Sequence, residues 1–581
     1  MISPFDTAAA AAAFRSLADD FWEALLNAYP SFATRIGDRR FDDRLEDLSS
    51  KARSAREASL AGTLASASSF RADLLGAVDR VSLSMLIEEA SGQLAALETR
   101  TDEWSVNPID GPQTWIVDLV DHQPIETVED GRRLVARARA VGPYMDQAID
   151  GLRTGMARGC VASAVPLSRV IDEVGLLVAV PADSWRLAGP ATEPHDDWDQ
   201  ADLASFRTNL VDSIEDIVIP AFRRYLDVLG QEIGPVARPS DRPGLIHVPG
   251  GEAAYRALAR SHVGLDIDPR AVHELGLREI ERIDEAFSDL GARVLGVHGL
   301  EATLAALGSD PALRFGSAAE VFDTAKRTLA RAEAAVPRWF GRVPALACEV
   351  LPIPDESAPH QTLAYYSWPT LDGSRPGRFY INLYAPETRP RFEAEALAFH
   401  EAVPGHHLQM ALAAELHDLP AFQRILGSNA FVEGWALYTE RLADEMGLYS
   451  SDMDRFGILS FDAWRASRLV VDTGMHALGW TRDQAIDFMR EHTALDDGNI
   501  ANEVDRYIAW PGQALAYKLG QLEILRLRAR AKAALGESFD IRAFHDVVLG
   551  SGAVGLTTLT GIVEAWIAER DPAVTVSPSR P

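Results

Sequence analysis

The sequence predicts a mainly α-helical protein that forms one large body, either as a single domain over 1–581 or as two lobes. The chain has 581 residues, which is ample for a large core. Nearly every segment has helical periodicity, and neither a low-complexity linker nor an internal repeat divides it. Gly and Pro gather at 234–251, the best candidate for a boundary or a lid loop. Two lobes would therefore be an N-terminal helical lobe, 1–240, and a second lobe, 250–570.

The predicted helices lie where apolar residues recur at the spacing of one helix face. In chain order they cover about 7–29, 129–157, 198–229, 269–291, 317–336, 390–403, 420–446, 452–478 and 499–534.

The region 343–384 supplies the clear strands, so we expect a small β-sheet next to the helix at 390–403. Its best strand is Arg378–Leu383. As an edge strand it would pair with an extended peptide, and Asn382 would add a substrate contact. As an internal strand of the sheet it would have no such role. The sequence leaves both possibilities open.

Residues 400–407, His-Glu-Ala-Val-Pro-Gly-His-His, form the most informative segment of the chain. A His-Glu pair followed by another histidine is how zinc hydrolases hold the metal and the general base together. In the usual H-E-x-x-H pattern the two histidines share a helix face, about 6 Å apart along the axis. Here position 404 is Pro, so the segment corresponds to that pattern with two residues inserted.

The second histidine ligand is ambiguous in this pattern. On an unbroken helix His406 would lie about 9 Å from His400 on nearly the opposite face, and His407 about 10.5 Å away on the same face. Neither could then share a metal with His400. Pro404 removes a backbone donor and Gly405 tolerates unusual backbone angles, so we expect a break that brings one of these histidines back into reach.

Glu433 is the candidate third ligand, because a zinc site of this type takes a protein ligand from a separate helix. The segment 430–447 is predicted to be a long helix closed by glycine. Glu433 stands among apolar neighbours in its first turn, where a carboxylate is costly to bury unless a cation satisfies it. Glu440 shares its face and could orient a ligand histidine. A salt bridge to Arg441, or solvent, is its more ordinary role.

Four ordered motifs carry a resemblance to a known bacterial family, domain of unknown function 885. They are His400-Glu401-x-x-Pro-Gly-His406-His407-Leu-Gln, Glu433-Gly-Trp-Ala-Leu-Tyr438, Asp472-Thr-Gly-x-His476 and Arg506-Tyr507-x-x-x-Pro-Gly-Gln-x-x-x-Tyr517. The likeness extends from Pro30–Gly37 to the last helices. The family resembles the zincin peptidases, with a distant likeness to thimet oligopeptidase, carboxypeptidase Taq and angiotensin-converting enzyme. This implies a helical zincin-like body, an enclosed substrate cleft, and His406 in preference to His407 as the second ligand.

One Zn²⁺ held by His400, His406 and Glu433 would acidify water, and Glu401 would take the proton as general base. Tyr507 is the first choice for stabilising the oxyanion. Tyr517 and His476 are reserves for that role. Arg506 and Lys518 are candidates for binding a substrate carboxylate, although structural ion pairs would explain them equally well.

The composition limits the possible binding partners and the cellular compartment of the protein. A net charge of -29 argues against nucleic acid and anionic membranes, because binding phosphate needs a basic surface. The beginning of the chain lacks the basic and apolar parts of a secretory signal, and two cysteines make no disulfide framework. A cytoplasmic protein is expected.

Together these features predict a zinc-dependent hydrolase of peptide or peptide-like amide bonds, most suited to short peptides. Two alternatives remain open. One is a metal-dependent hydrolase or lyase of a non-peptide metabolite, and the other is a metal-free binding protein on a relic peptidase scaffold. The sequence does not determine the oligomeric state.

Overall fold

The computed structural model describes residues 4–355, 358, 362–369 and 375–570. The chain is mainly α-helical, as predicted, and three strands form one small sheet in the described residues. Among these residues no helix has the length and apolar character needed to cross a membrane.

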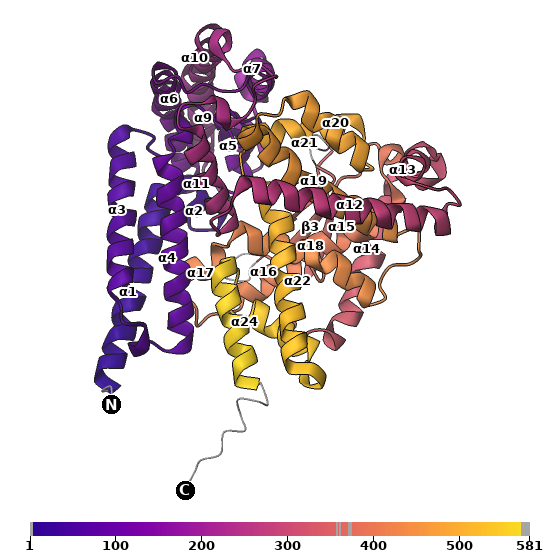
Figure 1. Cartoon of the computed structure of the whole chain (residues 1–581). Helices are drawn as coiled ribbons and strands as arrows, with labels where there is room; N and C mark the ends of the chain where they lie inside the picture. The colour runs from indigo at the N-terminus through magenta and orange to yellow at the C-terminus, as the bar shows by residue number, and fades with distance from the viewer. Residues whose placement is uncertain (1–3, 356–357, 359–361, 370–374, 571–581) are drawn as a thin grey trace.

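The N-terminal helices stand side by side at the left of Figure 1. Helices α1, α3 and α4 pack against one another, and α11 packs on α4. The helices up to this point are α1 (Pro4–Ala28), α2 (Pro30–Arg35), α3 (Ser50–Ser69), α4 (Ala77–Glu98), α5 (Pro112–Asp118), α6 (Val128–Ala157), α7 (Ala164–Ala179), α8 (Gly189–Thr192), α9 (Gln200–Ser213), α10 (Ile219–Val228) and α11 (Gly251–Val263).

The C-terminal part is organised around long helices that cross one another. Helix α12 packs along α19, and α18 packs along α22. The helices of this part are α12 (Pro269–Val294), α13 (Leu300–Ser309), α14 (Ala318–Ala335), α15 (Ala394–Glu401), α16 (His406–Ala414), α17 (Ala421–Ile425), α18 (Asn429–Glu445), α19 (Arg455–Leu478), α20 (Arg482–His492), α21 (Asp497–Ala509), α22 (Leu515–Leu535), α23 (Ile541–Leu549) and α24 (Leu556–Arg570).

Two of the helices predicted from the sequence are each divided into two shorter helices in the structure. The helix predicted over 420–446 is interrupted between α17 and α18, and the one predicted over 499–534 is interrupted between α21 and α22. The second break contains Pro511 and Gly512, whose φ of 81° lies in the left-handed region that glycine tolerates. These breaks place α18 and α22 independently of the helices that precede them.

The small sheet has the order β1-β3-β2, with β1 (Cys348–Pro352) parallel and β2 (Ala364–Ser367) antiparallel to β3 (Gly377–Ile381). The predicted strand at 378–383 is therefore the central strand β3, and its backbone is paired on both sides. It cannot act as the edge strand for a peptide. The sheet contacts both α15 and α16, so it does lie next to the helix that carries His400.

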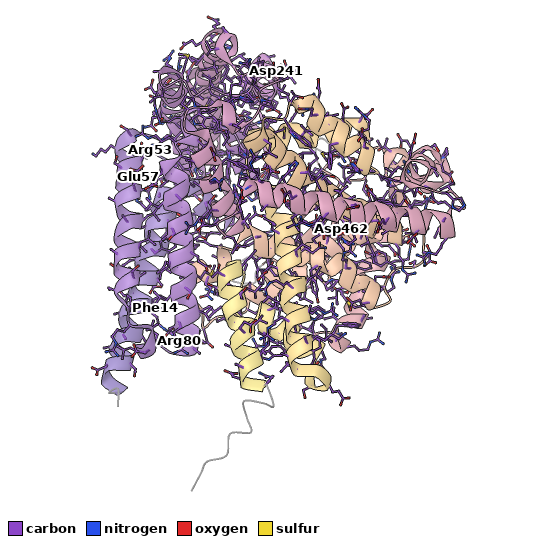
Figure 2. The ribbon with its side chains drawn as sticks, in the orientation of Figure 1. Phe14, Arg53, Glu57, Arg80, Asp241 and Asp462 are labelled. Atoms are coloured by element: carbon purple, nitrogen blue, oxygen red, sulfur yellow. The ribbon has the colours of Figure 1, made fainter. Side chains whose placement is uncertain are left out.

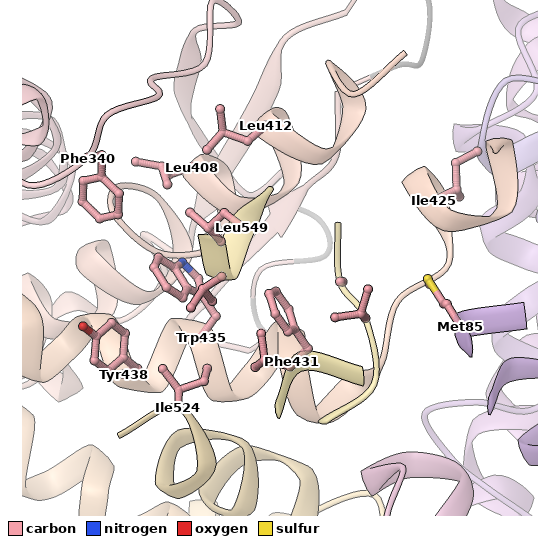
Figure 3. Packing of buried hydrophobic residues seen from close by; sticks show 14 of the residues in the cluster. Met85, Phe340, Leu408, Leu412, Ile425, Phe431, Trp435, Tyr438, Ile524 and Leu549 are labelled. Atoms are coloured by element: carbon pink, nitrogen blue, oxygen red, sulfur yellow. The ribbon is translucent and has the colours of Figure 1, made fainter. Parts of the chain in front are cut away.

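The buried core is not divided at residue 240. One cluster joins residues of α1, α3 and α4 with residues between 315 and 567. In Figure 3, Met85 of α4 lies near Ile425, in the same cluster as Phe431 and Trp435 of α18. A separate cluster lies within 106–233, in the helices at the top of Figure 1. The helices around residues 106–233 therefore have their own core, whereas the first helices share theirs with the C-terminal part.

Candidate metal centre

The segment between α15 and α16 folds back so that two histidines meet. Helix α15 ends at Glu401 and α16 begins at His406, and the Val403–Pro404 peptide bond between them is cis. A Cβ atom on Gly405 would lie 2.0 Å from the carbonyl oxygen of His400. Only glycine permits this approach. The rings of His400 and His406 consequently meet edge to face, with centroids 4.8 Å apart.

Glu433 of α18 completes a buried cluster with these two histidines. Its Oε2 lies 3.7 Å from Nε2 of His400 and 3.6 Å from Nε2 of His406. The candidate ligand atoms of the three residues all lie within 4.8 Å of one another. Tetrahedral zinc with bonds of about 2.1 Å places its ligand atoms about 3.4 Å apart. Two nitrogens and a carboxylate oxygen at these separations fit such an ion.

His407 faces away from this cluster. Its Nδ1 accepts a hydrogen bond from the Tyr366 hydroxyl at 2.9 Å, and its Nε2 donates to the carbonyl oxygen of Leu346 at 3.1 Å. Both ring nitrogens are therefore used in holding α16 to the sheet and to the segment before it. Of the two histidines that the sequence left open, His406 is the one that joins His400.

Glu440 is placed to orient the ligand histidine His400, and it does not form a salt bridge to Arg441. It is 1% exposed, and its Oε1 accepts a hydrogen bond from Nδ1 of His400 at 2.8 Å. This bond fixes the tautomer of His400 and leaves Nε2 directed at Glu433. Arg441, the salt-bridge partner expected for Glu440, pairs with Asp462 instead.

The depth of Glu433 is fixed by a close crossing of α18 and α22. A Cβ atom on Gly434 would lie 2.4 Å from Cα of Gly520, and one on Gly520 would lie 1.8 Å from the carbonyl oxygen of Ala430. The two glycines therefore let the helix backbones touch. Glu433 precedes the contact on one helix, and Tyr517 lies one turn before it on the other.

The electrostatics of the cluster are those of acids and imidazoles held together away from water. Burial raises the pKa of Glu401 to about 7, and Glu433 adds to this effect. Burial acts against ionised Glu433 too, but the nearby imidazoles of His400 and His406 bring its pKa to about 2. Burial lowers the pKa of His406 to about 4. Glu433 thus remains an anion and His406 a neutral imidazole at neutral pH, which are the forms that bind metal. Burial acts against protonated His400, but the carboxylates of Glu433 and Glu440 raise its pKa to about 9, so metal binding must displace a proton from this imidazole.

Tyr507 does not offer a free hydroxyl to this centre, contrary to its predicted role. Its oxygen accepts hydrogen bonds from Arg468 at 2.8 Å and from Trp464 at 3.1 Å, and donates one to Glu503. It is only 1% exposed. Tyr507 therefore belongs to the packing between α19 and α21.

The side chains of His476 and Asn382 are also hydrogen-bonded within the protein. His476 accepts a hydrogen bond at Nδ1 from the Leu245 amide and donates from Nε2 to the carbonyl oxygen of Tyr507. Asn382 donates to the carbonyl oxygens of Ala358 and Thr362. Both side chains are buried, so these contacts replace the predicted substrate contacts.

Lys518 belongs to a buried ion-pair cluster. Its ammonium group donates to Asp462 and Gln521, and it lies 3.1 Å from a carboxylate oxygen of Glu279. This is the structural ion pair that the sequence allowed as the alternative. The carboxylate-binding role predicted for Lys518 is therefore wrong, because the charge is already neutralised within the core.

Tyr517, a reserve in the sequence prediction, is the tyrosine that lies beside Glu433. It is partly exposed, and both burial and the charge of Glu433 raise its pKa. The Arg468 guanidinium lies over its ring, 4.2 Å from the centroid. Arg506 also acts on it, while pairing with Glu503 at 3.1 Å. Tyr517 thus connects the metal cluster to a group of arginines.

Two arginines of α19, Arg465 and Arg468, were missed by sequence reasoning. Both are buried. The signal was available, because they are cations one turn apart in the strongly apolar segment 456–478. The same reasoning that identified Glu433, a charge among apolar neighbours in a helix, applies to them.

The fold and the cluster together define a mainly α-helical protein with three candidate metal ligands on three helices, α15, α16 and α18. The chain belongs to the family described as "Bacterial protein of unknown function (DUF885)", whose model matches residues 30–563. No protein with a curated description matches it.

Solved structures with a similar fold include the following two. One, from Colwellia psychrerythraea and described as a "putative lipoprotein", is 29% identical with a TM-score of 0.89, covering 96% of this chain and 99% of that one. Another, from Shewanella oneidensis and described in the same way with unknown function, is 17% identical with a TM-score of 0.74, covering 95% of this chain and 99% of that one. At that identity the second likeness concerns the fold alone.

Proposed function

We propose that this protein is a zinc-dependent hydrolase of peptide or peptide-like amide bonds that acts on short peptides in the cytoplasm. The observation that carries the proposal is the cluster of His400, His406 and Glu433, with the half-buried Glu401 next to the first ligand. A relic scaffold has no need of a general base beside three ligand atoms. The distant kinship with zincin peptidases and the enclosed cleft are parts of the same proposal.

Each protein residue of the site has a proposed role in the reaction that follows from its position. When bound, zinc supplies Lewis acidity, which polarises a substrate carbonyl and makes water more acidic. Glu440 holds His400 in the tautomer that directs Nε2 to the ligand cluster. Glu401, whose pKa burial raises to about 7, is suited to take a proton from water and return it to the leaving amine. Tyr517, beside Glu433, replaces Tyr507 as the donor to the developing oxyanion.

The test is metal content per chain, measured by plasma mass spectrometry on protein purified without chelator. We expect one zinc per chain in the wild type, and loss of that zinc in His400→Ala and Glu433→Ala. Glu401→Gln should keep the zinc and lose cleavage of a mixed-peptide substrate pool, because it removes the base and no ligand.

His407→Ala is the matched control for His406→Ala, since the two residues are adjacent and both buried. We expect His406→Ala to lose zinc and His407→Ala to retain it. No zinc in the wild type after zinc is added back would contradict the proposal. Equal zinc loss in Glu401→Gln and His400→Ala would contradict the assignment of Glu401 as the base.

A further inference from the structure

Three arginines beside the candidate metal centre carry buried donors that have no acceptor. Arg465 is 5% exposed, and among the described residues neither its Nε nor its Nη1 has a hydrogen-bond partner. Nη1 of Arg468 and Nε of Arg506 are also buried without a hydrogen-bond partner among these residues. Buried polar groups in native proteins are nearly always hydrogen-bonded, and a charged group left without a partner is the costliest exception. Buried charged donors that lack partners in the described residues favour an acceptor supplied by a ligand.

Ion pairs among the described residues involve two of the three guanidinium groups. Glu503 is shared, at 3.0 Å from Arg468 and 3.1 Å from Arg506, and it also accepts a hydrogen bond from Tyr507. Glu503 therefore pairs with two guanidinium groups. Arg465 is in no ion pair of the described residues, although the charge of Glu440, whose Oε2 also lacks a hydrogen-bond partner, acts on it.

Arg465 is held in a fixed orientation without any acceptor. Its guanidinium lies over the ring of Trp464, 4.1 Å from the centroid, and over that of Phe461, 4.5 Å from the centroid. Aromatic stacking of this kind restrains the planar group and leaves its edge available for hydrogen bonds. A planar donor edge that is already oriented loses little entropy when a ligand binds.

The arginines lie near the candidate reaction centre. Arg465 acts electrostatically on Glu401, His406 and Glu440. Tyr517, which lies beside Glu433, interacts with Arg465 and Arg468. An anion bound by these guanidinium groups would therefore lie next to the metal ligands and the general base.

We propose that Arg465, assisted by Arg468, forms a subsite for a carboxylate of the substrate, close to the bond that is cleaved. The inference rests on the hydrolase activity proposed above and specifies its substrate class: amides that carry a free carboxylate near the scissile bond. A guanidinium fork matches the two oxygens of a carboxylate in geometry as well as in charge. The carboxylate is either the C-terminal α-carboxylate of a short peptide or an acidic side chain.

The experiment compares zinc-loaded wild-type protein with Arg465→Met, Arg465→Lys and the control Arg455→Met. Arg455 begins the same helix, but its side chain is 42% exposed and pairs with Asp444 outside the site. Each protein is given one peptide in three forms: with a free C-terminus, with a C-terminal amide, and with a C-terminal amide and a penultimate glutamate. Circular dichroism and zinc content verify that each variant is folded and loaded.

We expect wild type and Arg455→Met to cleave at least one carboxylate form with kcat/KM at least about tenfold above the uncharged amide, as a charged hydrogen bond implies. Arg465→Met should bring this ratio close to one while zinc is retained. Arg465→Lys should keep part of the preference, since it keeps the charge and loses the fork. The better carboxylate form identifies whether a C-terminus or an acidic side chain is bound.

A binding measurement separates this inference from the proposed activity. N-acetylglycine should raise the melting temperature of wild type but not that of Arg465→Met, and N-acetylglycinamide should raise neither. If no peptide is cleaved while this pattern holds, the hydrolase proposal fails and the carboxylate subsite stands. Equal cleavage of the acid and amide forms, or a preference that survives in Arg465→Met, would overturn the subsite.

Discussion

Replacing Gly405 by alanine is expected to disrupt the metal centre without touching a ligand. The added Cβ would lie 2.0 Å from the carbonyl oxygen of His400 and 2.4 Å from that of Phe399. Carbon and oxygen atoms in contact are usually about 3.3 Å apart, so the start of α16 must move by about 1.3 Å. A displacement of that size exceeds the tolerance of about 0.2 Å for metal–ligand distances.

We expect Gly405→Ala to weaken zinc binding at least about 100-fold, the upper range for losing a residue that only orients a ligand. Overpacking should also lower the free energy of unfolding by about 1 to 3 kcal/mol. Zinc affinity would be measured by competition with a chromophoric chelator, and stability by urea unfolding of the metal-free protein. Gly561→Ala is the control, because a Cβ there meets nothing within 4 Å.

Wild-type zinc affinity in Gly405→Ala would refute this reasoning. It would mean either that α16 moves without displacing His406 or that His406 is not a ligand. Retained zinc in a Gly405→Ala, His406→Ala double variant would separate these explanations, since it excludes His406 as a ligand.

Two further predictions concern buried charges away from the ligands. Asp462, labelled in Figure 2, accepts from Lys518 in the core, so Asp462→Asn should destabilise the protein by about 3 to 5 kcal/mol in urea unfolding. Glu445→Gln, which breaks an exposed pair, should cost less than about 1 kcal/mol and serves as the control. Burial disfavours ionised Glu503, but Arg506 and Arg468 hold its pKa at about 2, below the ordinary 4.5. Ionised Glu503 therefore contributes about 3 kcal/mol to the free energy of unfolding above pH 4.5, and this contribution is lost as the pH falls toward 2. The pH dependence of unfolding should be flatter by that amount in Glu503→Gln, and identical slopes for the two proteins would contradict the assignment.

The sequence was most informative where the chemistry is local. Residues 400–407 and Glu433 could be identified because ligand types, their spacing and a Pro-Gly break stand close together in the chain. Helical periodicity likewise placed long helices such as α6 and α12 within a few residues of their ends. These signals depend on neighbours within a few turns, which a sequence contains directly.

Roles that depend on distant partners could not be predicted in this way. Tyr507 and Tyr517 are both tyrosines near helix ends, and only the packing of α19 against α21 and α22 shows which hydroxyl is already bonded. For Lys518 the sequence left carboxylate binding and a structural ion pair open, because its partners, Asp462 and Glu279, are 56 and 239 residues away in the chain. Arg465 was overlooked for the complementary reason, since its lack of a partner is a property of the folded protein.

The crossing of Gly434 and Gly520 has a consequence for how substrate reaches the centre. With no side chains between the backbones, α18 and α22 cannot slide or roll past each other without collision. Glu433 and Tyr517 are attached on either side of this contact and therefore keep a constant separation. In the proposed hydrolase, any opening that admits a substrate would therefore move other elements, while Glu433 and Tyr517 stay in place relative to each other.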